Sequence, residues 1–406
     1  MRTKPVLPCM TCAITAIALA FCSTTYAATT SNFNPDVSLV LDGRFASYSN
    51  TTDYELPGFM LGGEAEKSSL GFHPGHNELS FSSNIDDLFF GKLTTVIADH
   101  EAETEVELEE AFIETLGLGQ GVAIRAGRFY SDIGYMNNQH PHAWDFADAP
   151  LIYRGLFGGQ FIDDGLQVSW LAPTDLYFKL GFESTRGERF PGGGAANKGK
   201  GIQTVFAKLG GDIGDSHAWQ LGFSHWTADL DGRTAGGHEE PGSATETPSF
   251  TGDSQVNGVD FVWKWAPNGN SRERNLKIQG EYFTREEDGN VELIGSNPLE
   301  SSTYQGEQKG WYLQTVYQFM PRWRIGYRYD QLEADNKGSD LAALDEAGLN
   351  DRDHSPVQST LMVDYSHSEY SRIRLQYSKD ESYEDTDNII LMQFIVTMGA
   401  HGAHRF

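Results

Sequence analysis

Alternation of apolar and polar side chains is the feature that most limits the fold of this chain. Over most of the 406 residues the period is two, as where Leu79, Phe81 and Ile85 are separated by polar neighbours. After the N-terminal region, no stretch reaches the roughly 18 apolar residues of a transmembrane helix. A barrel wall with one face toward lipid and the other toward a lumen produces this pattern.

Such segments recur sixteen times. We predict strands near 35–48, 76–87, 88–99, 104–116, 121–130, 161–171, 175–186, 200–210, 217–229, 254–266, 275–286, 308–320, 322–332, 356–366, 371–380 and 388–406. An even number is the rule for bacterial single-chain barrels. The sequence therefore predicts an all-β fold, a transmembrane antiparallel β-barrel of about 16 strands. A soluble β-sandwich is the alternative, but it explains neither the N-terminal segment nor the connections.

The connections alternate in length. Short ones are expected at 172–175, 211–216, 319–322 and 366–370, and long polar ones near 187–200, 230–253, 287–307 and 333–355. Short turns at one end of a barrel and long loops at the other are typical of outer-membrane porins. Aromatic residues gather near the predicted strand ends, where they suit the two membrane interfaces.

The N-terminus has the order of a secretory signal peptide: basic residues, an apolar stretch near 9–22, and small residues up to Ala27. We expect residues 1–27 to be removed and 28–406 to form the barrel. All three cysteines lie in the removed part, so no disulfide is expected. A lipoprotein modified at Cys22 is the alternative, and the bulky residue before that cysteine disfavours it.

The last predicted strand keeps its alternation to a C-terminal phenylalanine, Phe406. This ending resembles the signal that outer-membrane barrels present to the barrel-assembly machinery, which we expect as a partner together with outer-membrane lipid. Without residues 1–27 the chain has 28 basic and 57 acidic side chains, a formal net charge of −29. This charge disfavours nucleic acid as a partner and favours dissolved cations.

Three motifs carry a family resemblance: Glu109-Glu110-Ala111-Phe112-Ile113-Glu114, Arg125-Ala126-Gly127-Arg128-Phe129 and Asp163-Asp164-Gly165-Leu166-Gln167. They resemble the phosphate-selective porin superfamily, in which a long segment follows the arginine-containing strand. Over most of its length the chain more closely resembles a proteobacterial group labelled zinc-regulated outer-membrane receptors. That likeness rests on residues 34–44, 145–150 and 399–404. It implies a porin-like barrel in the outer membrane of a Gram-negative bacterium.

Two departures narrow what the resemblance implies. Phosphate-selective porins line the pore with lysine and arginine, whereas this chain is strongly acidic, so phosphate selectivity does not follow. The receptor label implies TonB dependence, but such receptors have a separate plug domain ahead of a barrel of about 22 strands. Here the alternation begins within ten residues of the expected cleavage site, and 379 residues do not hold both parts.

We predict that residues 131–160 fold into the lumen as a constriction loop, the alternative being an ordinary surface loop. A carboxylate cluster that faces cationic side chains sets the ion preference of such a constriction. The candidate residues are Arg125, Arg128, Asp145, Asp148 and Arg154. The two strand arginines differ in parity, so both reach the lumen only if Gly127 between them marks a β-bulge.

Several of the twelve histidines are paired or lie beside carboxylates. Imidazole and carboxylate together suit zinc or a similar divalent ion. The candidate metal ligands are His73, His76, His100, His140 and His142. The alternative is that these are solvated loop histidines.

The sequence therefore predicts a channel for passive diffusion of small cationic or neutral solutes, serving zinc or other divalent metals. No cofactor is required beyond transient contact with Zn²⁺ or another divalent cation. The alternatives are a structural or adhesin barrel and a TonB-linked metal receptor. We predict no enzymatic activity, because the strand number exceeds that of the known enzymatic barrels. Barrels of this size are often trimers, so a homotrimer is one expected assembly.

Overall fold

The computed structural model describes residues 35–50, 54–100, 103–234, 246–296, 298–383 and 385–399, without the side chains of 99, 100 and 103. The predicted signal peptide 1–27 and the predicted end of the last strand lie outside these residues. The described residues form one compact unit.

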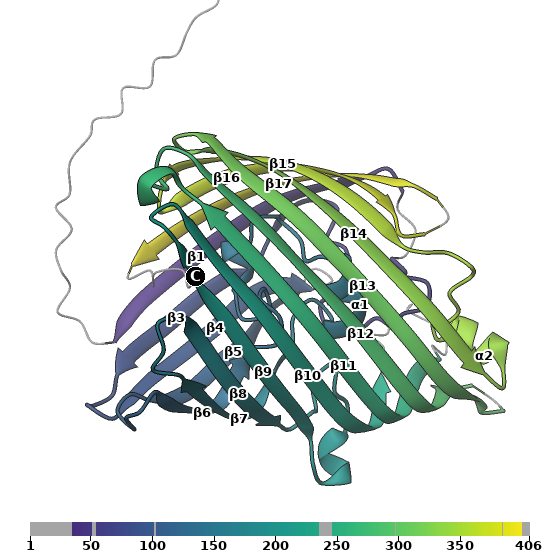
Figure 1. The fold of residues 1–406 in the computed structure, drawn as a ribbon. Coiled ribbons are helices and arrows are strands. Elements are labelled where there is room, and N and C mark those ends of the chain that lie inside the picture. The colour runs from purple at the N-terminus through teal and green to yellow at the C-terminus, as the bar shows by residue number, and fades with distance from the viewer. Residues whose placement is uncertain are drawn as a thin grey trace, which may run out of the picture. The chain divides into compact units, whose positions relative to one another are not determined.

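The strands form one closed antiparallel sheet (Figure 1). They are β1 (Asp36–Tyr48), β2 (Gly71–Pro74), β3 (Asn77–Asn84), β4 (Phe89–His100), β5 (Glu103–Thr115), β6 (Val122–Tyr130), β7 (Ile162–Leu171), β8 (Tyr177–Thr185), β9 (Ile202–Ile213), β10 (His217–Thr234), β11 (Thr247–Trp265), β12 (Asn275–Ile294), β13 (Glu300–Met320), β14 (Trp323–Gly338), β15 (Val357–Ser368), β16 (Ser371–Glu381) and β17 (Asp387–Gly399). From β3 onward each strand pairs with the next, and β1 pairs with β17, which closes the barrel.

The short strands β2 and β3 both pair with β1. They occupy one position in the wall, interrupted at Gly75 and His76, so the described residues form a barrel of sixteen wall positions. The predicted fold class is therefore confirmed. The expected alternation of short and long connections holds in part: β13 and β14 are separated by two residues and β14 and β15 by residues 339–356. Between β12 and β13, where a long loop near 287–307 was expected, the connection is only residues 295–299.

The helical elements are short and lie in the connections. They are η1 (Pro141–Ala143), α1 (Leu151–Phe157), η2 (Ala195–Lys198), η3 (Pro267–Gly269) and α2 (Leu341–Glu346). Among the described residues, no helix combines the length and the apolar character needed to cross a membrane. Helix α1 lies inside the barrel and α2 lies at its long-loop end (Figure 1).

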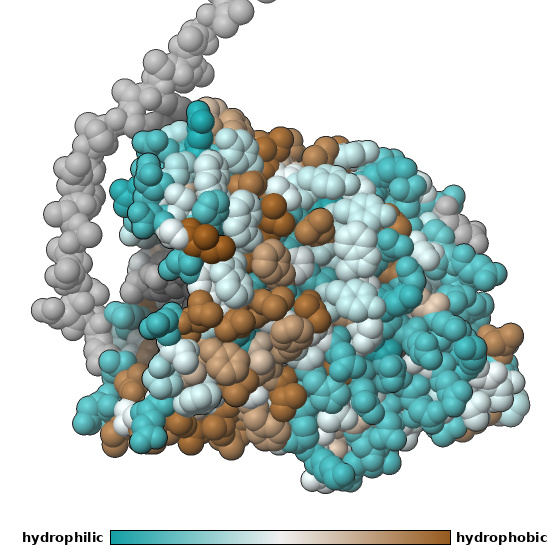
Figure 2. Space-filling view, in the orientation of Figure 1, coloured by the Kyte–Doolittle hydropathy of each residue, from teal (hydrophilic) through white to brown (hydrophobic). Residues whose placement is uncertain are grey.

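The outer face of the wall is apolar over a band. Exposed side chains on this face include Phe182, Phe223, Phe261, Tyr282, Leu313, Tyr327, Leu361, Leu375 and Phe394. Apolar residues gather over one part of the wall, while polar residues cover the side that holds α2 (Figure 2). A barrel that faces lipid requires an apolar band on its outer face, and its inner face can be polar.

Strands β10 to β14 continue well beyond the predicted ends, into segments that we expected to be loops. The prediction was wrong there because the hydrophobic pattern inverts along each strand. In β12 the outward Tyr282 is apolar and the inward Glu281 is polar, whereas farther along Val291 faces inward and Glu292 outward. The strand extensions therefore lie beyond the apolar outer band. Their inward apolar side chains, such as Val291, belong to an apolar cluster inside the barrel that includes residues of α1.

Gly127 offers a test of the wall. Its φ of +126° suits glycine, and an added Cβ would lie 2.2 Å from the carbonyl oxygen of Ala111 on the neighbouring strand. We expect Gly127→Ala to lower the free energy of unfolding by about 1–3 kcal/mol, measured from urea midpoints of the refolded protein. Gly43→Ala is the matched control, because an added Cβ there meets nothing within 4 Å. Equal midpoints for the two variants would contradict the described wall.

Candidate functional site

Residues 131–160, the predicted constriction loop, lie inside the barrel. Ile133, Leu151, Ile152 and Leu156 are fully buried. The wall binds the backbone of this segment through carboxylates. Glu281 accepts hydrogen bonds from the amides of Tyr135 and Met136 at 2.9 and 3.0 Å, and Asp330 accepts one from Leu151 at 3.1 Å. The backbone of the segment is therefore hydrogen-bonded to the wall at several residues.

A second segment, residues 54–70, also fills the lumen and was not predicted. Leu56, Phe59 and Met60 are buried. They belong to the same apolar cluster as helix α1 and the inward side chains of the long strands. The amide of Glu64 donates a hydrogen bond to the carbonyl of Gly158, at the end of α1, at 2.8 Å. The run of apolar residues from 56 to 61 was the signal in the sequence.

Asp145 and Asp148 face a cationic side of the wall. The Asp145 carboxylate lies 2.8 Å from Arg324 and 3.0 Å from Lys277, and Asp148 lies 3.0 Å from Arg328. Burial alone would raise the pKa of each aspartate, but these cations outweigh burial and hold both pKa values below the ordinary range. Both carboxylates are therefore ionised at neutral pH.

The other predicted constriction residues lie in different places. Arg154 is 3.9 Å from Asp148, and Arg125 is buried beside Glu114 at 2.6 Å. Arg128 pairs with the partly exposed Asp164. Strand pairing shows no register shift at Gly127, so the two strand arginines lie on opposite faces and only Arg125 points inward. The lumen arginines Arg324, Arg328, Arg372 and Arg374 were missed, because nothing in the sequence shows which wall faces the loop.

Three of the predicted metal ligands, His76, His140 and His142, come together with three carboxylates. We call these residues the His–Glu cluster: His76, Glu78, Glu109, Glu110, His140 and His142. Of the remaining two candidates, His73 lies opposite Arg44 of β1 in the strand pairing, and the side chain of His100 lies outside the described residues.

A β-bulge places two adjacent carboxylates in the lumen. Along the pair of β4 and β5, Thr94 lies opposite Glu110 and Thr95 opposite Leu108, so Glu109 is the extra residue. In a regular strand, neighbours face opposite sides. The bulge turns both Glu109 and Glu110 inward, where they are 7% and 6% exposed.

The contacts in the cluster are short. Nδ1 of His142 lies 2.7 Å from Glu78 Oε1, and Nδ1 of His140 lies 3.0 Å from Glu78 Oε2. Nε2 of His76 lies 2.7 Å from Glu109 Oε1. Three imidazole rings and three carboxylates thus lie together. Zinc binds both kinds of ligand.

Two groups border the cluster. Lys92 Nζ lies 2.5 Å from Glu110 and 3.0 Å from Nε2 of His140, and the Tyr130 hydroxyl donates a hydrogen bond to Glu109. Burial alone would lower the pKa of His140, but the carboxylates of the cluster outweigh burial and raise that pKa well above its usual value.

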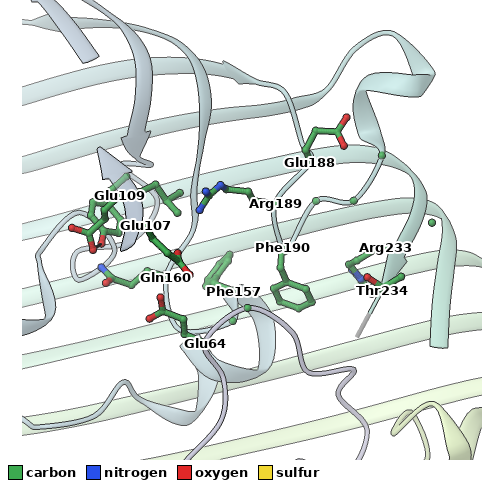
Figure 3. Close-up of a pocket in the computed structure, with 18 of the residues that line it drawn as sticks. Glu64, Glu107, Glu109, Phe157, Gln160, Glu188, Arg189, Phe190, Arg233 and Thr234 are labelled. Atoms are coloured by element: carbon green, nitrogen blue, oxygen red, sulfur yellow. Dashed lines mark hydrogen bonds between the residues drawn. The ribbon is translucent and has the colours of Figure 1, made fainter. Parts of the chain in front are cut away.

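A cavity of about 670 Å³ opens at the long-loop end beside the cluster, and we call it the loop-end cavity. His76, Glu109 and Tyr130 are among its lining residues. Figure 3 shows Glu107 and Glu109 together on one side, with Phe190 and Arg233 on the other. The cluster is therefore reached from the loop end of the barrel.

A second cavity of about 450 Å³ lies at the short-turn end, lined in part by Asp132, Gln139 and Lys179. Gln160 lines the loop-end cavity, and its amide donates a hydrogen bond to the carbonyl of Gln139 at 2.9 Å. This contact within the 131–160 segment joins a residue that lines one cavity to a residue that lines the other.

Comparison with known proteins gives the following. No protein-family model matches the chain. Solved structures with the same fold include OmpT, an outer membrane protein of Vibrio cholerae, in a trimer form, with a TM-score of 0.54 and 9% identity over 90% of this chain and 99% of that one. The outer membrane channel DcaP of Acinetobacter baumannii has a TM-score of 0.52 and 13% identity, over 90% of this chain and 97% of that one. An anion-selective porin from Comamonas acidovorans has a TM-score of 0.50 and 10% identity, over 90% of this chain and 99% of that one.

At these identities the likeness concerns the fold, which is that of outer-membrane porins and channels. Sequence similarity is higher to an uncharacterized protein of Aquifex aeolicus (strain VF5), which is 30% identical over 402 residues that cover 92% of this chain and 80% of that protein. This chain belongs to the same family as that Aquifex aeolicus protein.

Proposed function

We propose that the protein is an outer-membrane channel of a Gram-negative bacterium through which small solutes diffuse passively, with a preference for cations. Divalent metal ions, zinc first, are the proposed special solutes. The observation that carries the proposal is the His–Glu cluster at the inner side of the loop-end cavity. The resemblance of the sequence to zinc-regulated outer-membrane receptors supports the choice of zinc.

The lumen charges support the cation preference. Carboxylates follow β5 from the loop-end cavity toward the short turns: Glu107, Glu109, Glu110 and Glu114. On the opposite side, Arg324 pairs with Asp145 and Asp364, and Arg328 pairs with Asp148. A lumen lined by carboxylates concentrates cations and repels anions.

The shared fold supports a trimeric assembly, because OmpT of Vibrio cholerae has this fold in a trimer form. We propose a homotrimer, with outer-membrane lipid around it. The proposal involves no covalent chemistry and no organic cofactor.

A specific observation favours a second candidate function. The two lumen segments pack an extensive apolar cluster inside the barrel, including Phe59, Tyr153 and Phe283. A barrel filled in this way also suits a structural or adhesin protein, or a metal receptor that opens only when energised. Either of these would show no conductance in a planar bilayer.

The first test is single-channel conductance of the refolded protein in planar bilayers under a salt gradient. We expect a reversal potential of cation-selective sign and zinc-induced flicker or reduction of the current, because a bound ion delays the next. His142→Ala should weaken the zinc effect, and His225→Ala should keep it in full, since that imidazole bonds Asn257 on the wall. Anion-selective currents, or currents indifferent to zinc, would refute the corresponding part of the proposal.

A second test concerns the cationic side of the wall. Asp145→Asn removes the charge that pairs with Lys277 and Arg324, so we expect the reversal potential to shift toward anions. Breaking a buried pair also leaves charges uncompensated, so the free energy of unfolding should fall by on the order of 3 kcal/mol. Asp335→Asn is the control, because its pair with Lys337 is exposed. A selectivity that stays unchanged in Asp145→Asn would show that this side does not border the ion path.

A further inference from the structure

The His–Glu cluster contains two groups of three metal-ligating side chains, and Glu78 belongs to both. One group is His76, Glu78 and Glu109, and the other is Glu78, His140 and His142. Within each group, one ligand atom from each residue lies within 4.8 Å of the others. The two groups are therefore adjacent.

We propose that these groups are two successive binding stations for divalent cations of the zinc class, with Glu78 as the bridging ligand. This inference rests on the proposed channel function and names the site that the cation visits. The outer station is His76, Glu78 and Glu109, and the inner station is Glu78, His140 and His142. An ion that enters from the loop-end cavity binds at the outer station and passes along the Glu78 carboxylate to the inner one.

Access sets the order of the stations. His76 and Glu109 line the loop-end cavity together with the carboxylates of Glu64 and Glu107. His140 and His142 are not among the described residues that line it. An ion drawn in by the outer carboxylates therefore reaches the outer station first.

The bridging role of Glu78 follows from its two oxygens. Oε2 lies 3.0 Å from Nδ1 of His140, and Oε1 lies 2.7 Å from Nδ1 of His142 and 3.7 Å from Nε2 of His76. Ligand atoms about 2.0–2.1 Å from a tetrahedral zinc ion are roughly 3.3 Å apart. The observed separations bracket this value, so small side-chain rotations are enough to admit an ion at either station.

Two buried atoms of the cluster lack a hydrogen bond. Oε2 of Glu109 and Nδ1 of His140 are 3.2 Å apart, but neither makes a hydrogen bond within the described part of the chain. Their contacts are ion-pair contacts, and Nδ1 of His140 also lies 3.0 Å from Oε2 of Glu78. A metal ion satisfies carboxylate oxygens and imidazole nitrogens of this kind without requiring hydrogen-bond geometry.

Lys92 explains why the cluster offers two cation-binding stations and not three. Its ammonium contacts both Glu110 and Nε2 of His140, so the third carboxylate of the cluster already has a fixed positive partner. A third divalent ion would be repelled there. Two neighbouring sites that share a ligand also weaken each other when both are occupied, which allows an ion to leave as the next one enters.

The rings of the inner station are held in place by the loop that carries them. The imidazoles of His140 and His142 are stacked with centroids 5.6 Å apart, on either side of Pro141 at the start of η1. Arg372 of the wall donates a hydrogen bond to the carbonyl of His142. The inner station is therefore a preorganised pair of rings that faces Glu78.

The experiment is zinc binding to the refolded full chain in detergent, measured by titration calorimetry. The number of ions is taken as the difference between wild type and each variant, which cancels binding by other histidines. We expect Glu78→Gln to lose two ions, His76→Ala to lose one and His142→Ala to lose one. His225→Ala should lose none. Equal losses in Glu78→Gln and His142→Ala, or no loss in either, would overturn the shared ligand.

Folding and adjacency are checked separately. Each variant must show the circular dichroism spectrum of wild type before its titration is compared. Cu²⁺ replaces Zn²⁺ in such donor sets, so two bound copper ions should show magnetic coupling in electron paramagnetic resonance, which Glu78→Gln should abolish. Two uncoupled copper signals would overturn the adjacent stations.

The channel and the stations fail in different ways. A loss of two ions in Glu78→Gln without any conductance of the wild-type protein supports the stations and refutes the channel. Cation-selective conductance in potassium chloride without zinc binding supports the channel and refutes the stations.

Discussion

Closure of the sheet between β1 and β17 is the constraint on which the rest of the structure depends. In lipid, each backbone N–H and C=O group needs a partner within the protein, and a closed sheet provides one for every strand. Closure also fixes an inside and an outside, so a period of two becomes an apolar outer face and a polar inner face. A ring of sixteen wall positions encloses a wide lumen, which residues 54–70 and 131–160 then fill.

Filling a lumen with chain creates buried polar groups, and these groups determine how the charges are arranged. Wall carboxylates such as Glu281 and Asp330 accept hydrogen bonds from amides of the inner segment. Wall arginines such as Arg324 and Arg328 bind its aspartates. An unpaired charge in this position would cost several kcal/mol. The segment is therefore anchored on its cationic side, while the acidic side holds the His–Glu cluster.

The sequence predicted the barrel, its strand number and the inward position of residues 131–160, because a period of two survives in every strand that crosses the apolar band. It could not predict the extensions of β10 to β14, because outward polar residues there resemble a loop. It predicted His76, His140 and His142 as metal ligands, but not the carboxylates that lie beside them. Glu78 was not among the predicted ligands, since alternation shows which face a residue occupies and not what lies across the lumen.

The bulge in β5 shows why the partners were hidden. A regular strand would place either Glu109 or Glu110 against lipid, where an ionised carboxylate is unfavourable. One extra residue turns both inward at the level of His140, so negative charge is concentrated at a point that strand periodicity alone would not produce. Two adjacent carboxylates next to imidazole rings repel each other unless a cation lies between them. Lys92 supplies one such cation from the wall, and the remaining carboxylate, Glu109, is the one that faces the cavity from which ions enter.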